Sequence, residues 1–124
     1  MSQLGPFKVG DNVINTCDFY VPLGNGCSGR ELVTPECMSL GELQQMHSNV
    51  LILPAHTLFN IQQISKVTFR HEGGYASSFK IDFEALDGKQ RGRTFDASEV
   101  FMKWQPNYAV PPGGFSVFIE KVNP

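Results

Sequence analysis

The fold is decided by residues 79–95, which read FKIDFEALDGKQRGRTF. In the first half of this stretch, apolar Phe79, Ile81 and Phe83 alternate with charged residues, as in a strand that buries one face. Asp87-Gly88 follows, a dipeptide preferred in two-residue hairpin loops because both central positions of a type I′ turn need positive φ. The stretch therefore predicts a β-hairpin that runs from Phe79 to Phe95.

This two-residue loop also predicts how the strands pair. Glu84 would lie opposite Arg91, and Asp82 opposite Arg93, on the outward face of the hairpin. Such opposite charges contribute about 0.2 to 1 kcal/mol per pair, and a slip by one residue would expose the apolar face. The register thus accounts for the basic cluster around Lys89 as part of the scaffold.

Outside the hairpin, the sequence predicts short strands and one short helix. Ser39 and Glu42 have the spacing of a capping box, which indicates a helix over residues 40–48. The apolar run 50–53, stopped by Pro54, is typical of a strand buried on both faces. Further β-rich stretches are residues 17–22, 58–61, 64–70 and 116–122, and a helical turn is predicted over residues 97–103.

Three stretches resemble the first strand, central hairpin and final turn of SH3-like or Tudor-like small barrels: Phe7–Val13, Phe83–Lys89 and Thr94–Phe101. The resemblance covers about half of the chain and implies an architecture only. We expect a mainly β fold (β-rich α+β) in a single domain over residues 1–124. It would be a strongly bent antiparallel sheet or partly open small barrel of about six or seven strands, with one short helix near residues 40–48.

Composition and charge narrow the classes of partner. The chain has 124 residues, is 41% hydrophobic, and carries a formal net charge of -2. A slightly acidic chain offers no general attraction to nucleic acid or to an anionic membrane surface. The N-terminus lacks the features of a signal peptide, and no apolar run reaches transmembrane length, so we expect a cytoplasmic protein without a membrane partner.

Cysteine and histidine supply the residues that could carry chemistry. Cys17, Cys27 and Cys37 recur every ten residues, and His47 continues the interval. Zinc sites draw ligands in close pairs, and no such pair is present, so we expect small unpaired thiols, no metal and no cofactor. The three histidines, His47, His56 and His71, are expected to be structural, because an acid or base needs a partner in space that sequence does not supply.

Aromatic residues near loops are the strongest hint of function. They are Tyr75, Trp104, Tyr108 and Phe115, and apolar loop residues either pack onto the core or meet a partner. Without a catalytic motif, we expect a non-catalytic binding or interaction module that uses these residues, with a protein partner or self-association. A structural homo-oligomer is one alternative. A small-ligand-binding protein or unrecognised hydrolase with a histidine in a pocket is another, and nucleic acid is disfavoured.

Overall fold

A computed structural model of the chain describes residues 3–24, 26–101, 103–104, 109–110 and 117–122. The fold is mainly β, with 47% strand and 11% helix. In chain order the elements are β1 (Gln3–Leu4), β2 (Phe7–Lys8), β3 (Asn12–Asn15), β4 (Phe19–Leu23), α1 (Leu40–Met46), β5 (Asn49–Leu53), β6 (Leu58–His71), β7 (Gly74–Ala85), β8 (Thr94–Asp96), the 3-10 helix η1 (Ser98–Phe101), β9 (Lys103–Trp104), β10 (Ala109–Val110) and β11 (Ile119–Lys121).

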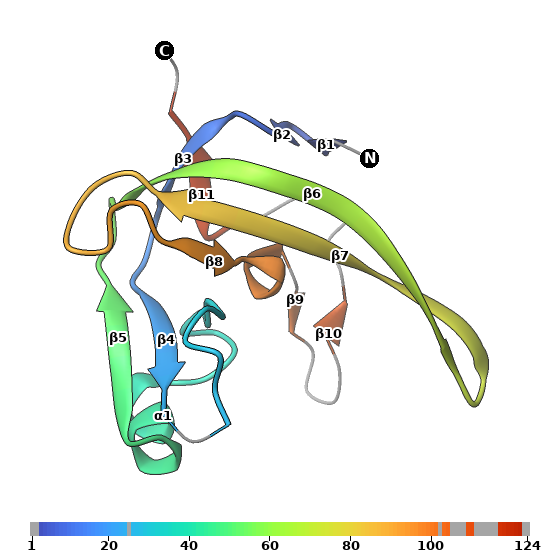
Figure 1. The fold of residues 1–124 in the computed structure, drawn as a ribbon, viewed down its shortest axis with the longest axis horizontal. Coiled ribbons are helices and arrows are strands. Elements are labelled where there is room, and N and C mark those ends of the chain that lie inside the picture. The colour runs from blue at the N-terminus through green and yellow to red at the C-terminus, as the bar shows by residue number, and fades with distance from the viewer. Residues whose placement is uncertain (1–2, 25, 102, 105–108, 111–116, 123–124) are drawn as a thin grey trace.

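The main sheet has five antiparallel strands in the order β11-β3-β6-β7-β8. Three two-stranded sheets accompany it: β1–β2, β4–β5 and β9–β10. Figure 1 shows the main sheet as a strongly curved surface, with β4, β5 and α1 grouped at one end of it. Over the described residues the sheet does not close, because its edge strands β8 and β11 are not paired with each other.

These features confirm the expected fold class. Seven of the strands in the described part of the chain are three residues or longer, and the other four are two-residue strands. The predicted short helix is α1, and the predicted helical turn before Trp104 is η1. The bent antiparallel sheet therefore matches the architecture that the small-barrel resemblance implied, in its open form.

Buried aromatic rings hold the sheet against β4 and η1. Phe59 of β6 lies with its ring centroid 6.1 Å from that of Phe19 in β4 and 5.7 Å from that of Phe83 in β7. Phe101 of η1 meets Phe83 edge to face, with ring centroids 6.2 Å apart. Phe19, Phe59 and Phe83 are fully buried, so their removal from water is the main driving force for this arrangement.

The predicted hairpin exists, but its register is wrong by three residues. Phe83 lies opposite Phe95, and Glu84 lies opposite Thr94, so neither predicted charge pair forms. Ile81 and Phe83 are fully buried, as their alternation predicted. The connection is a longer loop rather than a two-residue turn, and the amide of Ala85 donates to the carbonyl of Arg93.

Burial explains the shift. The predicted register would place Phe95 opposite Lys80 on the outward face, whereas in the structure Phe95 is fully buried. Burying a Phe side chain is favourable by about 1.5 to 3 kcal/mol, which is at least comparable to the upper limit of about 2 kcal/mol for two exposed charge pairs. The longer loop is held by Asp87, whose Oδ1 accepts a hydrogen bond from the amide of Leu58, and by positive φ at Gly88 and Gly92.

The basic cluster is consequently not neutralised across the hairpin. Arg93 donates to Oε1 of Gln90 and to the carbonyl of Gly29, and its guanidinium lies 5.2 Å from the ring centroid of Phe95. Lys89 and Arg91 are exposed. Arg93 therefore ties the hairpin loop to the segment that follows β4.

Helix α1 begins as predicted and ends two residues early. The hydroxyl of Ser39 accepts a hydrogen bond from the amide of Glu42 and donates one to the Glu42 carboxylate. This side-chain pairing satisfies an amide of the first helical turn, which has no partner within the helix. Of the helix residues, Leu43 is buried.

Strand β5, which follows the helix, is not buried on both faces as predicted. The run 50–53 forms the main part of β5, but Ile52 is 42% exposed and only Leu53 is buried. In the described residues β5 pairs with β4 alone, so it lies in a two-stranded sheet with one face open to water. An apolar run alone does not distinguish a strand covered on both faces from one covered on a single face.

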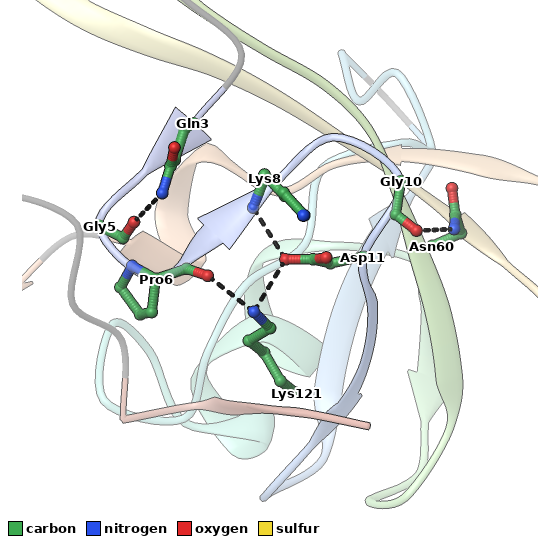
Figure 2. Close-up of polar contacts among 8 residues, drawn as sticks. All are labelled: Gln3, Gly5, Pro6, Lys8, Gly10, Asp11, Asn60 and Lys121. Atoms are coloured by element: carbon green, nitrogen blue, oxygen red, sulfur yellow. Dashed lines mark hydrogen bonds and ion pairs between the residues drawn. The ribbon is translucent and has the colours of Figure 1, made fainter. Parts of the chain in front are cut away.

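The start and the end of the described chain are joined by a polar cluster (Figure 2). Nζ of Lys121 in β11 lies 3.4 Å from Oδ2 of Asp11 and donates to the carbonyl of Pro6 at 3.0 Å. The same carboxylate oxygen accepts a hydrogen bond from the amide of Lys8. The Asp11 side chain is 12% exposed and that of Lys121 is 39% exposed, so the ion pair is only partly shielded from water, and it links the loop before β3 to β11.

Candidate functional site

The longest feature of the fold is the hairpin of β6 and β7. The two strands pair over twelve positions, from Phe59 opposite Ala85 to His71 opposite Gly74. Their neighbours are much shorter, since β3 and β8 each pair with only three residues at the inner end. Figure 1 shows the outer part of this hairpin extending well beyond the rest of the sheet. We call residues 65–80 the arm.

The sequence explains why the arm forms and why it curves. Val67, Thr68 and Phe69 belong to residue types that favour extended backbone, and Glu72-Gly73 makes the tight turn at the tip of the arm. The register shifts between Ile61 and Gln63, so that one additional residue lies on β6 at the base of the arm. Such a bulge bends a strand and increases its twist, and Figure 1 shows β6 and β7 curving along their length.

One face of the arm continues the core-side face of the sheet. Directly opposed residues of antiparallel strands point to the same face, and the buried pair Ile64 and Ile81 marks the core side. Two and six positions further out lie Lys66 opposite Phe79, and Arg70 opposite Tyr75. Phe79 is half-buried and packs against the core, whereas the others are exposed.

Tyr75 is the most exposed of the large apolar side chains whose burial the structure describes, with 75% of its surface accessible. The opposite face of the arm carries Val67, which is 42% exposed, and Lys80. The arm therefore presents aromatic and aliphatic surface interspersed with three cations, Lys66, Arg70 and Lys80. Of these residues, the exposed tyrosine and Arg70 belong to the types enriched in contact surfaces between proteins, whereas lysine is depleted there.

The edges of the arm are also open. Among the described residues, no third strand pairs with β6 beyond Ile61 or with β7 before Ile81. In a two-stranded ribbon, alternate backbone N–H and C=O groups on each strand point away from the partner strand. These groups can pair with an additional strand, and charged residues such as Lys66 limit uncontrolled pairing of this kind.

The structure places the predicted contact residues in two regions. Tyr75 lies on the arm, and Trp104 lies in β9, where it pairs with Ala109 of β10. Tyr108 and Phe115 lie outside the described residues. Figure 1 shows β9 and β10 on the side toward which the arm curves. A contact surface shared by all four residues therefore stays a prediction, and Tyr75 is the member whose exposure the structure gives.

Sequence reasoning missed one pair of chemically active side chains. Sγ of Cys27 lies 3.2 Å from Nδ1 of His47, and both residues are half-buried. Twenty residues separate them, and they come together because the loop after β4 meets the C-terminal end of α1. No short motif signals this contact, although both residues belong to the ten-residue interval of cysteines and histidine.

The other two cysteines have acidic neighbours. Burial raises the pKa of the Cys17 thiol, and the nearby charge of Asp18 adds to the effect. Burial also raises the pKa of the Cys37 thiol, to about 12, with further contributions from the charge of Glu99 and a hydrogen bond to its carboxylate. Both environments favour the neutral thiol, which is a poor nucleophile.

Among the described residues, no three side chains of His, Cys, Asp or Glu are grouped closely enough to hold a metal ion. Nor does any helix in the described segments combine the length and apolar character that crossing a membrane requires. Comparison with models of known protein families, with curated protein sequences and with solved structures gave no match. The structural evidence for function therefore comes from the arm and from the Cys27–His47 pair.

Proposed function

We propose that this chain is a non-catalytic binding module whose contact element is the arm and whose partner is a protein. The observation that carries the proposal is the projection of the β6–β7 hairpin beyond the sheet with Tyr75 exposed near its tip. A two-stranded hairpin is of marginal stability by itself, and its outer half gains little from the core. Contact with a partner would compensate by burying Tyr75 and Val67.

The charge of the arm also indicates the chemical character of the partner. Residues 65–80 carry three basic residues and one acidic residue, whereas the remainder of the chain carries seven basic and eleven acidic ones. A partner segment with acidic side chains would complement this local positive charge. The open edges fit an extended segment that adds a strand through backbone hydrogen bonds, with side-chain contacts supplying specificity. A cytoplasmic location belongs to the same proposal, because Cys17, Cys27 and Cys37 are all free.

A direct test uses a fluorescent ten-residue peptide in which Glu and Val alternate. We expect it to bind the wild-type protein in fluorescence anisotropy, with affinity that falls as salt is added. Tyr75→Ala should weaken binding by about tenfold or more, as for an aromatic residue at the centre of an interface. Val9→Ala, which alters an exposed side chain outside the arm, is the matched control and should bind like wild type.

Three results would contradict this proposal: no binding of the acidic peptide, equal binding of a peptide in which Lys replaces Glu, or full affinity in Tyr75→Ala. A single-stranded oligonucleotide of ten thymidines is measured in parallel. Binding of the oligonucleotide without binding of the peptide would assign the arm to nucleic acid and overturn the protein partner.

Self-association is a second candidate function, favoured by the contrast in charge between the basic arm and the acidic remainder. A second copy of the chain would supply both an acidic surface and an open strand edge. We expect sedimentation velocity to show a dimer that forms with rising protein concentration and dissociates with added salt. Lys66→Glu should abolish the dimer, and Lys89→Glu, in the exposed hairpin loop, is the control of equal charge change. A monomer at every concentration would exclude this function.

A further inference from the structure

The loop after β4 is held closely against the end of α1. His47 caps the C-terminal end of α1, and its amide donates to the carbonyl of Leu43 at 2.9 Å. The next residue, Ser48, has its hydroxyl so close to Gly24 that any side chain at position 24 would collide with it. Gly24 also has a φ of +100°, which strains any other residue, whereas the hydroxyl of Ser48 can rotate away from an added side chain.

This close approach fixes the sulfur of Cys27 beside the imidazole ring. The amide of Cys27 donates to the carbonyl of Gly24 at 3.0 Å, which closes a turn and orients the cysteine. Sγ then lies 3.2 Å from Nδ1 of His47, within the range in which a thiol and an imidazole share a proton. The contact comes from two segments whose backbones are each locally constrained.

Cys17 and Cys37 serve as comparisons for Cys27, because all three cysteines are free and half-buried. Asp18 adjoins Cys17, and Glu99 accepts a hydrogen bond from Cys37, whereas Cys27 has the imidazole. Burial and Glu99 raise the pKa of Cys37 to about 12, so its thiol stays protonated at neutral pH. An imidazole rather than a carboxylate beside the sulfur therefore distinguishes Cys27.

We propose that Cys27 is a thiol-modification site that reacts with hydroperoxides, with His47 as the residue that accepts its proton. The site lies at the junction of β4 and α1, which Figure 1 shows at the opposite end of the molecule from the tip of the arm. The inference is independent of the binding function proposed for the arm.

The reaction balances with a hydroperoxide as the oxidant. The imidazole of His47 takes the thiol proton, and the sulfur then attacks the terminal oxygen of the peroxide. A sulfur–oxygen bond forms while the oxygen–oxygen bond breaks, so the sulfur loses two electrons and the peroxide gains them. The leaving alkoxide or hydroxide receives the proton from the imidazolium, which gives a sulfenic acid and an alcohol or water.

The first experiment measures how fast iodoacetamide labels each cysteine of the folded wild-type protein at pH 7. Digestion with trypsin, which cleaves after Arg30, and with a protease that cleaves before Asp18 places each cysteine in its own peptide for mass spectrometry. We expect Cys27 to react about tenfold faster than Cys17 or Cys37. In urea the three rates should converge, because the neighbours that distinguish the thiols are then removed. Cys17 or Cys37 reacting as fast as Cys27 in the folded protein would overturn the proposal.

The second experiment tests the role of His47 and the class of oxidant. His47→Gln keeps a hydrogen-bonding side chain but accepts no proton, and should slow the labelling of Cys27 by about tenfold with an unchanged circular dichroism spectrum. His56→Asn is the matched control, since asparagine tolerates the positive φ at this position.

Hydrogen peroxide followed by dimedone, which traps sulfenic acids, should give an adduct on Cys27 of the wild-type protein. An unchanged rate in His47→Gln, or no dimedone adduct on Cys27, would contradict the assignment. The ranking of the wild-type thiols needs no variant, so it stands as a test even if His47→Gln does not fold.

Discussion

Replacing Phe83 by Ala is expected to lower the free energy of unfolding by about 3 to 5 kcal/mol. Phe83 is fully buried in β7, opposite Phe95 of β8, and its ring also contacts those of Phe59 and Phe101. Alanine would leave a cavity at the point where β6, β8 and η1 meet. Close packing on every side prevents the neighbouring rings from filling it without strain. Urea denaturation followed by circular dichroism measures the loss.

A control lies in the same strand. Tyr75→Ala also removes an aromatic ring from β7, but from a site that is 75% exposed, so its cost should stay within about 0.5 kcal/mol. Because small domains are stable by only about 5 to 15 kcal/mol, Phe83→Ala could leave much of the chain unfolded. Phe83→Leu retains most of the side-chain volume, so its free energy of unfolding should lie between those of the wild type and Phe83→Ala, where it can be measured. Similar stability of Phe83→Ala and Tyr75→Ala would contradict the packing described for the core.

Replacing Asn15 by Leu is expected to lower the free energy of unfolding by about 2 to 4 kcal/mol, although the variant is more apolar. The Asn15 side chain is fully buried, and its Nδ2 donates to the carbonyls of Leu53 at 3.3 Å and Pro54 at 2.9 Å. Its Oδ1 accepts a hydrogen bond from the amide of Thr57 at 2.8 Å. The side-chain amide of Asn15 thus binds the turn between β5 and β6 to β3. Leucine would remove its hydrogen bonds to the carbonyls of Leu53 and Pro54 and to the amide of Thr57.

A second substitution separates the hydrogen bonds from the packing. Asn15→Asp has nearly the same shape and keeps the acceptor for Thr57, but it replaces the donor with an oxygen that faces the carbonyls of Leu53 and Pro54. At pH 7 it should therefore be at least as unstable as Asn15→Leu in urea denaturation. Wild-type stability in either variant would show that this amide does not hold the turn in place.

The sequence predicted which residues of the hairpin face the core, but not how its strands pair. Alternation identifies Ile81 and Phe83 as buried because it reflects the two-residue period of a strand. The register depends on contacts made elsewhere, namely the space that receives Phe95 and the amide of Leu58 that binds Asp87. A preference for a two-residue turn is a local energy, and the burial of one aromatic ring outweighs it.

For the candidate sites too, the sequence identifies single residues, whereas their spatial arrangement depends on the fold. Tyr75 could be identified from its place near a predicted loop, because loops lie at the surface of a protein. The length of the arm could not, since it depends on where β3 and β8 stop pairing with β6 and β7. The contact of Cys27 with His47 depends on the path of a loop across twenty residues, and only the folded chain brings them together.

The position of β3 in the main sheet has a consequence for the order in which the chain folds during synthesis. One edge of β3 pairs with β6 and the other with β11, and the amide of Thr16 donates to the carbonyl of Phe118. At a synthesis rate of about 5 to 20 residues per second, β3 waits about 5 to 20 s for β11 to be made. The β3 edge that pairs with β11 therefore stays open until β11 has been made, and the sheet is completed only by closing a loop of about a hundred residues.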